Sequence, residues 1–558
     1  MLTQIFQTIT TKMIAVAMIL VVIVLLNGCM VGPNYKEPHT QVENQWVERK
    51  AVSGKPYGTP EIFWWKNFND PTLVCLIEIA YENNPTLQSA GVKILGERAL
   101  LNRSIGNLLP QQQGVSGAYN FNYIPRASNF TTSGTANSLL NTLVGGNIPN
   151  INPYSVSNQY FFSSSWEIDF WGKYRRKIES DKDSYLASVA AYDDALVTLI
   201  GDVAQNYVNV RTYEEQIRIT QENVKVQKES LLIATARFNG GQVSQLDVTQ
   251  AQTELSQTEA QIPGYENSLR QSKNALALLL GLPPSGIDPL LRPGKIPAVP
   301  ASMTVGIPND LLRRRPDVRQ AGLKAASKSA LIGVEITNLL PSFSLTGTFG
   351  ATSSNLGNQQ LVDIFNWQNS LVNVANGFTM PIFNYGRLEN QVRVADANFQ
   401  AAILNYQNTV LSAQKEVENG LSAYKHGRDS LACLAEAVKA AKQSTKLAMV
   451  RYMEGQTDYT TVLTAEEKQL SVENSYASTQ GNTVLGVVAT YRALGGGWQI
   501  RCGRDVISDA VKKQMADRTN WGKMLTPKNH LPVISPEEQP AAAVPKHWPL
   551  WNLLNVNK

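Results

Sequence analysis

Residues 237–251 read RFNGGQVSQLDVTQA, and residues 451–465 repeat this pattern as RYMEGQTDYTTVLTA. The offset between the two stretches is 214 residues, and five positions are identical. These positions are Arg237, Gly241, Gln242, Val248 and Ala251. The same offset relates Gly172 to Gly386 and Leu280-Gly281 to Leu494-Gly495. The repeat therefore extends far beyond the stretch in which it is easiest to see.

Further towards the N-terminus the offset becomes 231, since the sequence NLLP occurs at residues 107–110 and again at 338–341. The extra residues of the first copy fall between 124 and 160, in a Ser/Thr/Asn/Gly-rich stretch typical of a long loop. The chain is thus a tandem duplication, which favours a pseudosymmetric structure.

Each copy is expected to contain two very long helices. No proline occurs between Lys173 and Gln261 or between Ile382 and Thr526, although the chain has 27 prolines. We predict helices over 173–239, 243–280, 387–453 and 458–494, after shorter helical stretches at 71–109 and 309–339. A helix of 67 residues would be ~100 Å long.

The apolar residues of these helices follow a heptad, beginning Val203, Val210 and Ile217. The second heptad position is polar (Glu214, Gln221), which favours a curved wall over a solid bundle; a helix frayed on one face is the alternative. The glycines at 240–241 and 455 are typical of helix ends. The repeated stretch is therefore predicted to be the tip of an antiparallel helical hairpin.

Four segments alternate between apolar and polar residues, at about 113–124, 158–168, 342–352 and 371–382. About ten residues of alternation with aromatic residues near the ends is typical of a transmembrane β-strand, although a soluble hairpin would look similar. Four strands cannot close a barrel in a bilayer, and open edges are not tolerated in lipid. If these strands span a membrane, several copies must pool them.

The N-terminus resembles a secretory signal. Fourteen apolar residues, 13–26, precede Asn27-Gly28-Cys29. As a helix they would cover only ~21 Å, short of a bilayer core. The sequence LNGC at 26–29 is similar to a bacterial lipobox, so we predict a signal peptide over 1–28 and lipid attachment at Cys29. A chance cysteine behind an ordinary signal is the alternative.

Composition excludes several classes of function. The net charge of +5 is spread without a basic block, which disfavours nucleic acid as a partner. The four histidines and four cysteines show no metal-ligand or disulfide spacing, and we predict neither a metal nor a cofactor. The motifs GxxxxGK[ST], HExxH and GxSxG are absent, so an enzyme is not expected.

Several short motifs resemble the TolC-like outer-membrane efflux family, and specifically its NodT-type lipoprotein branch. They occur in the family's order over about 29–497: CMVGPNYKEP at 29–38, WWKNFND at 64–70, Asn84-Pro85, WEIDFWG at 166–172, IPNDLLRRRPDV at 307–318 and PIFNYGR at 381–387.

The resemblance implies a mostly α protein with membrane β-structure: a homotrimer with a 12-stranded β-barrel in the outer membrane and a 12-helix α-barrel in the periplasm. Its partners would be outer-membrane lipid, a periplasmic adaptor and an inner-membrane pump. The expected organisation is an extended segment over 29–70, repeats over 71–281 and 309–497 joined by a linker over 282–308, and an extended Pro-rich tail over 498–558.

The family often narrows its periplasmic end with acidic residues after the tip glycine of the second repeat. Here Thr461 and Thr464 occupy positions that are frequently acidic in relatives, so Asp458 and Tyr459 are the remaining gate candidates. An exposed turn aspartate is the alternative reading of Asp458, and Asp247 is expected to be solvated. The candidate adaptor-docking residues are Gly241, Gln242, Val243, Ser244, Gly455 and Gln456.

The predicted function is a passive outer-membrane exit duct for small molecules such as drugs. The same architecture could serve type I protein secretion, and nothing in one chain separates the two. A periplasmic coiled-coil scaffold without a pore would explain the heptads but not the four alternating segments.

Overall fold

The computed structural model describes residues 30–40, 42, 46–48, 63–123, 154–299, 314–355, 361–526 and 531. Residue contacts divide the chain into two compact units. Unit 1 comprises Met1–Tyr35, Ala99–Lys182 and Ala326–Gln400; unit 2 comprises Lys36–Arg98, Asp183–Ala325 and Ala401–Lys558. Cys29 and the predicted signal peptide lie outside the described residues.

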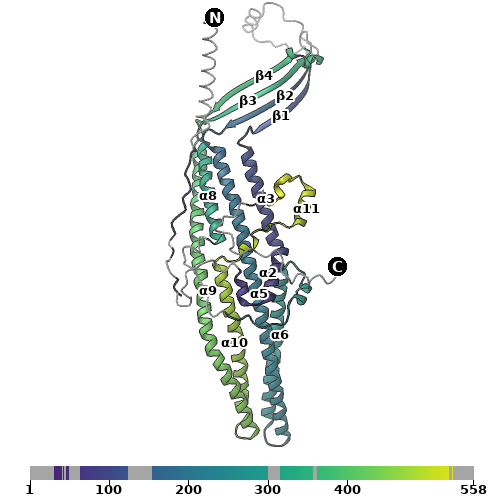
Figure 1. Ribbon diagram of the computed structural model, residues 1–558, viewed down its shortest axis with the longest axis vertical. Helices are drawn as coiled ribbons and strands as arrows, with labels where there is room; N and C mark the ends of the chain where they lie inside the picture. The colour runs from purple at the N-terminus through teal and green to yellow at the C-terminus, as the bar shows by residue number, and fades with distance from the viewer. Residues whose placement is uncertain are drawn as a thin grey trace, which may run out of the picture. The chain divides into compact units, whose positions relative to one another are not determined.

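Unit 1 contains a four-stranded antiparallel sheet in the order β1-β2-β3-β4 (Figure 1). Its strands are β1 (Gln112–Tyr123), β2 (Tyr154–Ile168), β3 (Ser342–Ser354) and β4 (Ser370–Thr379). The hairpin β1-β2 comes from the first repeat and β3-β4 from the second, and β2 pairs with β3 to join them. The four predicted strands are confirmed. Strand β4 ends before the predicted 382 because Pro381 has no N–H to donate to a ladder.

Two short 3₁₀ turns, η5 (Leu361–Phe365) and η6 (Trp367–Asn369), connect β3 to β4. The first-repeat loop predicted over 124–160 is shorter than expected at its C-terminal end, since β2 already begins at Tyr154. Its other residues, 124–153, lie outside the described part of the chain.

Four long helices form two hairpins (Figure 1). The first pairs α5 (Lys173–Asn239) with α6 (Gln245–Leu279), and the second pairs α9 (Arg387–Met453) with α10 (Tyr459–Ala493). The predicted bounds of α5 and α9 are confirmed at both ends. Both helices begin in unit 1 and continue into unit 2. No helix in the described part of the chain is apolar over enough residues to cross a membrane.

The predicted helical stretch at 71–109 is in fact two helices, α2 (Pro71–Asn83) and α3 (Pro85–Gly106). Asn84 is extended, with φ −64° and ψ 118°, because a residue that precedes proline avoids the helical region. Its side-chain oxygen accepts a hydrogen bond of 2.8 Å from the Leu87 N–H and thereby caps α3. The helix α8 (Pro316–Thr337) opens the second repeat.

The prediction of an extended tail from residue 498 was wrong for its first part. Residues 498–526 contain the 3₁₀ turns η7 (Trp498–Arg501) and η8 (Gly522–Leu525) and the helix α11 (Asp509–Arg518). Trp498 and Ile500 are buried in unit 2. The Pro-rich composition that suggested an extended chain begins only at Pro527, which lies outside the described residues.

Candidate functional site

The sheet of unit 1 exposes apolar side chains along its outermost strands. On β1, Val115, Tyr119 and Phe121 are exposed, and on β4 Val374 and Phe378 are each 72 % exposed. In the described chain β1 pairs only with β2, and β4 pairs only with β3. One edge of each outer strand is therefore left without a ladder partner. A sheet of this kind is incomplete in either water or lipid.

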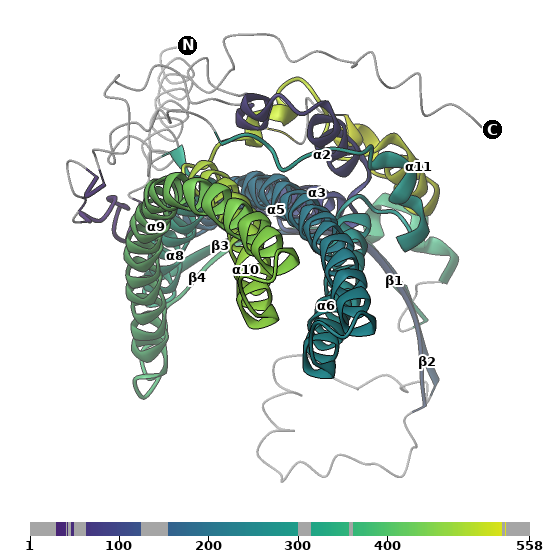
Figure 2. The same ribbon diagram turned by 90° about the horizontal axis from the view of Figure 1, so that it is seen from below.

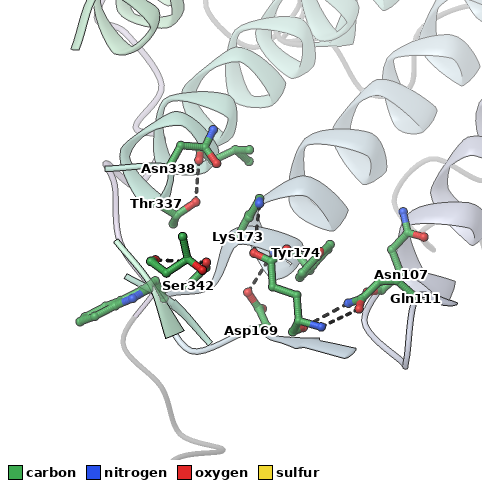
Figure 3. A network of polar contacts seen from close by, with 12 residues as sticks. Asn107, Gln111, Asp169, Lys173, Tyr174, Thr337, Asn338 and Ser342 are labelled. Atoms are coloured by element: carbon green, nitrogen blue, oxygen red, sulfur yellow. Dashed lines mark hydrogen bonds and ion pairs between the residues drawn. The ribbon is translucent and has the colours of Figure 1, made fainter. Parts of the chain in front are cut away.

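A polar network fixes the start of α5 to the end of β2 (Figure 3). The Asp169 carboxylate accepts hydrogen bonds from the Tyr174 N–H at 3.0 Å and the Arg175 N–H at 3.1 Å, and so satisfies the first turn of the helix. The Gln111 side chain bonds both backbone groups of Glu167, at 2.7 Å and 3.1 Å. The helix therefore continues from the sheet through a rigid junction and not through a free loop.

The first described residues are bound to the same unit. The Val31 N–H donates to the Trp171 carbonyl at 3.1 Å. The buried Arg176 guanidinium donates to the carbonyls of Val31 at 3.0 Å and Gly32 at 3.1 Å. Gly172 has φ +82°, and a Cβ on it would lie 2.6 Å from the Met30 side chain. The chain segment directly after Cys29 is thus held against the junction between β2 and α5.

The two helical tips of unit 2 have the same backbone geometry. In the first, the N–H of Gln242 donates to the carbonyl of Arg237 at 2.9 Å; in the second, Gln456 donates to Arg451 at 2.9 Å. Gly241 and Gly455 have φ of +71° and +74°. This is a Schellman motif, which needs a residue in the left-handed region and favours glycine there. The repeated sequence is therefore confirmed as a pair of hairpin turns.

Most of the candidate docking residues are accessible at these turns. Gly241, Gln242, Ser244, Gly455 and Gln456 are exposed. Ser244 also caps α6, because its hydroxyl accepts a hydrogen bond of 3.2 Å from the Leu246 N–H. Val243 is partly buried and packs against the apolar cluster between the hairpins.

The gate candidates separate into two groups. Asp458, Thr461 and Thr464 are exposed, and the Thr461 hydroxyl donates to the Asp458 carboxylate at 3.0 Å. Tyr459, by contrast, is buried against Tyr452, with the two ring centroids 5.3 Å apart. The Tyr459 ring thus belongs to the apolar core between the two hairpins, whereas the other three gate candidates are on the surface of the chain.

The two hairpins share one apolar cluster near their tips, and α6 contacts α10, which lies next to it in the view from below in Figure 2. Their shared core contains one alanine from each of three helices and a pair of tyrosines: Ala234, Ala251, Ala448, Tyr452 and Tyr459, with Val462. The small residues allow the helices to approach, and the tyrosines fill the remaining space.

A hydrogen bond crosses between the hairpins at this point. The Tyr452 hydroxyl of α9 donates to the Asp247 carboxylate of α6 at 3.1 Å. Asp247 is partly exposed, as expected for a surface residue, but it also has this partner on the other hairpin. The Arg237 guanidinium lies 4.7 Å from the centroid of the Tyr452 ring. Burial and the neighbouring Asp247 raise the pKa of Tyr452 to about 12, which keeps the phenol protonated as the donor.

Sequence reasoning missed this contact between repeats, although both residues are in the repeated stretches. The position equivalent to Tyr452 in the first copy is Phe238, which is exposed and lacks a hydroxyl. The tyrosine in the second copy, where the first copy has phenylalanine, was the signal in the sequence that could have indicated a hydrogen bond at this position.

The fold and these surfaces define a class of protein: a duplicated unit in which an apolar, open-edged sheet continues into long helical hairpins, as in outer-membrane channels with a periplasmic helical extension. The model of the family "Outer membrane efflux protein" matches residues 125–282 and 307–496, and the chain belongs to this family. The family is one of outer-membrane channels, which confirms the outer-membrane location and the prediction that the chain is not an enzyme.

Similar proteins cover most of the chain. It is 29 % identical over 490 residues to the solvent efflux pump outer membrane protein SrpC of Pseudomonas putida, covering 86 % of this chain and 97 % of that protein. It is 28 % identical over 449 residues to nodulation protein T of Rhizobium leguminosarum bv. trifolii, covering 80 % and 90 %.

Solved structures show the same fold. The outer-membrane channel OprN matches with a TM-score of 0.74 at 28 % identity, covering 84 % of this chain and all of that one. The open state of the Neisseria gonorrhoeae MtrE channel matches with a TM-score of 0.68 at 26 % identity, covering 84 % and 99 %. The predicted resemblance to TolC-like channels is confirmed.

Proposed function

We propose that this chain is the exit duct of a tripartite efflux pump and passively conducts small molecules, such as drugs or solvents, across the outer membrane. The observation that carries the proposal is the apolar sheet with an unpaired edge on both β1 and β4. Edge pairing between copies satisfies both edges at once, and three copies of a four-stranded sheet supply a closed barrel of twelve strands.

The relatives support the efflux role over protein secretion. SrpC and a further relative at 29 % identity, TtgI, are described as outer-membrane proteins of solvent and toluene efflux pumps. A duct needs no chemistry of its own, so the energy for transport comes from an inner-membrane pump that a periplasmic adaptor links to it. The exposed tip residues Gln242 and Gln456 and their neighbouring glycines are the proposed adaptor contacts, which photo-crosslinking from Gln242 would detect.

Conductance in a planar bilayer tests both the duct and its gate. The purified protein is expected to form discrete, long-lived pores, and an acidic ring of three Asp458 side chains should make them prefer cations. Asp458→Asn is expected to lower the cation-to-anion permeability ratio several-fold. Thr461→Val removes the neighbouring hydroxyl but keeps the charge, so it should leave the ratio unchanged.

Failure of the purified protein to form pores would contradict the proposal that it is a duct. Pores whose selectivity is the same with and without the Asp458 carboxylate would retain the duct and exclude Asp458 from its narrow part, leaving it as an ordinary turn residue.

Lipid attachment at Cys29 completes the proposed placement in the outer membrane. The bonds that hold Val31 and Gly32 at the start of α5 support it, because they would keep an acyl chain on the preceding cysteine close to the sheet. Wild-type protein should incorporate radiolabelled palmitate and Cys29→Ser should not. Equal labelling of both proteins would place the lipid elsewhere.

A further inference from the structure

Two buried carboxyl groups lie between the hairpins, just inside the apolar tip cluster. Glu254 of α6 is 5 % exposed and Glu466 of α10 is 2 % exposed. Both are held from α5: the Gln227 amide donates to Glu254 at 3.2 Å, and the Ser230 hydroxyl donates to Glu466. The two acids therefore approach each other across the junction between the first and second hairpins.

Gln227, Ser230, Glu254 and Glu466 form a buried polar layer that has more hydrogen-bond acceptors than donors. The second carboxyl oxygen of Glu466 and the side-chain oxygen of Gln227 are both buried, and neither has a hydrogen-bond partner among the described residues. An unmet buried acceptor is costly, whereas a proton on Glu466 supplies a donor. A proton on Glu466 would therefore lower the number of buried oxygen atoms that are left without a hydrogen-bond donor.

No basic side chain pairs with Glu254 or Glu466 among the described residues. On α5, Lys228 pairs with the exposed Glu259 at 2.9 Å, and Arg237 lies over the Tyr452 ring, with its Nε and one Nη atom buried and without a hydrogen-bond partner. On α9, Lys442 pairs with Glu473 at 2.8 Å.

The titratable groups whose charges act on the pair are themselves acids: Glu467 of α10 acts on Glu254, and Glu254 acts on Glu466. The pair also acts on Tyr459 of α10, which in turn lies near Asp247 of α6 and Tyr452 of α9. None of these can supply a positive charge. Ionising both Glu254 and Glu466 would therefore place two uncompensated negative charges inside the helical core.

Burial, together with the charge of Glu254, raises the pKa of Glu466 to about 7, although the hydrogen bond from Ser230 acts in the opposite direction. Burial and the charge of Glu467 likewise raise the pKa of Glu254. A carboxyl group whose pKa is higher when the hairpins are packed together than when it is exposed to water stabilises the packed hairpins. This stabilisation is fully present below the ordinary pKa of 4.5. This stabilisation is lost as the pH rises through about 7.

The pair is not inherited from the duplication. At the 214-residue offset, the position equivalent to Glu466 is Gln252 and the position equivalent to Glu254 is Lys468, and both of these side chains are exposed. The two acids meet only because of the register in which the hairpins pack.

We propose that Glu254 and Glu466 form a proton latch: the protonated pair holds the two hairpins of one chain together, and its deprotonation releases them. In the proposed duct, this latch would favour a closed tip in an acidic periplasm and an open tip at alkaline pH. That consequence rests on the proposed function, whereas the latch itself is a property of the single chain.

Hydrogen exchange of the full-length protein in detergent tests the latch at pH 5.5 and 8.5, after correction for the intrinsic exchange rate. In the wild type, amides of residues 227–237 and 459–470 are expected to open at least about tenfold more often at pH 8.5. Glu466→Gln, which is neutral at every pH, should remove this difference. Glu454→Gln, an exposed acid at the same tip, should leave it intact.

A wild-type opening constant that is the same at both pH values would overturn the latch, and so would a Glu466→Gln protein that keeps the full pH dependence. Glu254→Gln provides a second variant if Glu466→Gln folds poorly, and unchanged protection of residues 189–210 verifies the fold of either one. The measurement needs neither a pore nor a partner. A failed latch is therefore distinguishable from a failed duct.

Discussion

Val374→Arg is expected to prevent the chain from assembling in a bilayer, while the same change at the adjacent Asn373 is expected to be tolerated. Val374 is 72 % exposed on β4, opposite Gly347 of β3, and it belongs to the apolar set of its strand. If this face meets lipid, the charge costs about 2–4 kcal/mol per copy at the middle of the bilayer. In water, an exposed Val→Arg change would cost almost nothing.

Asn373 provides the matched control because neighbouring residues of a strand point to opposite faces. Outer-membrane fractions should contain Asn373→Arg protein, and its oligomer should resist mild detergent as the wild type does. Val374→Arg protein should be lost from that fraction. Equal membrane assembly of the two variants would mean that β4 does not face lipid, and this would contradict the proposed twelve-stranded barrel.

Asp193→Ala is expected to destabilise unit 2 by about 3–5 kcal/mol, since it leaves a buried charge without its partner. The Asp193 and Arg501 side chains are 0 % and 4 % exposed, and the guanidinium donates twice to the carboxylate, once at 3.0 Å. Arg501 lies in η7 of the C-terminal segment. Its release should make the segment susceptible to trypsin after Arg501 and Arg504.

Asp202→Ala is the control for this change. Asp202 pairs with Arg492 at 2.9 Å, but these side chains are 36 % and 40 % exposed, so its loss should cost only about 0–1 kcal/mol. The double change Asp193→Leu with Arg501→Met should recover most of the lost stability, because it removes both charges together. Equal protease resistance of the Asp193→Ala and wild-type proteins would contradict a structural role for residues 498–526.

The repeat, the helices and the strands could be predicted from the sequence because each is encoded by local patterns. The absence of proline indicated that α5 and α9 are uninterrupted, and the tip glycines marked where each hairpin turns. The break at Asn84 was missed, although Pro85 was a visible signal for it. Membership of the efflux family followed from motifs spread over most of the chain.

The sequence by itself thus determined the order of the elements in the two repeats, the bounds of the two longest helices and the family to which the chain belongs. Tertiary structure alone decided which distant residues meet: Tyr452 with Asp247 and Glu254 near Glu466 between the copies, and Arg501 of the C-terminal segment with Asp193 of the first copy. Each of these contacts joins residues about 200 or more positions apart, and it depends on helix register and packing. A period of seven residues defines which face of a helix is buried, but it contains no information about which residue of another helix that face will meet.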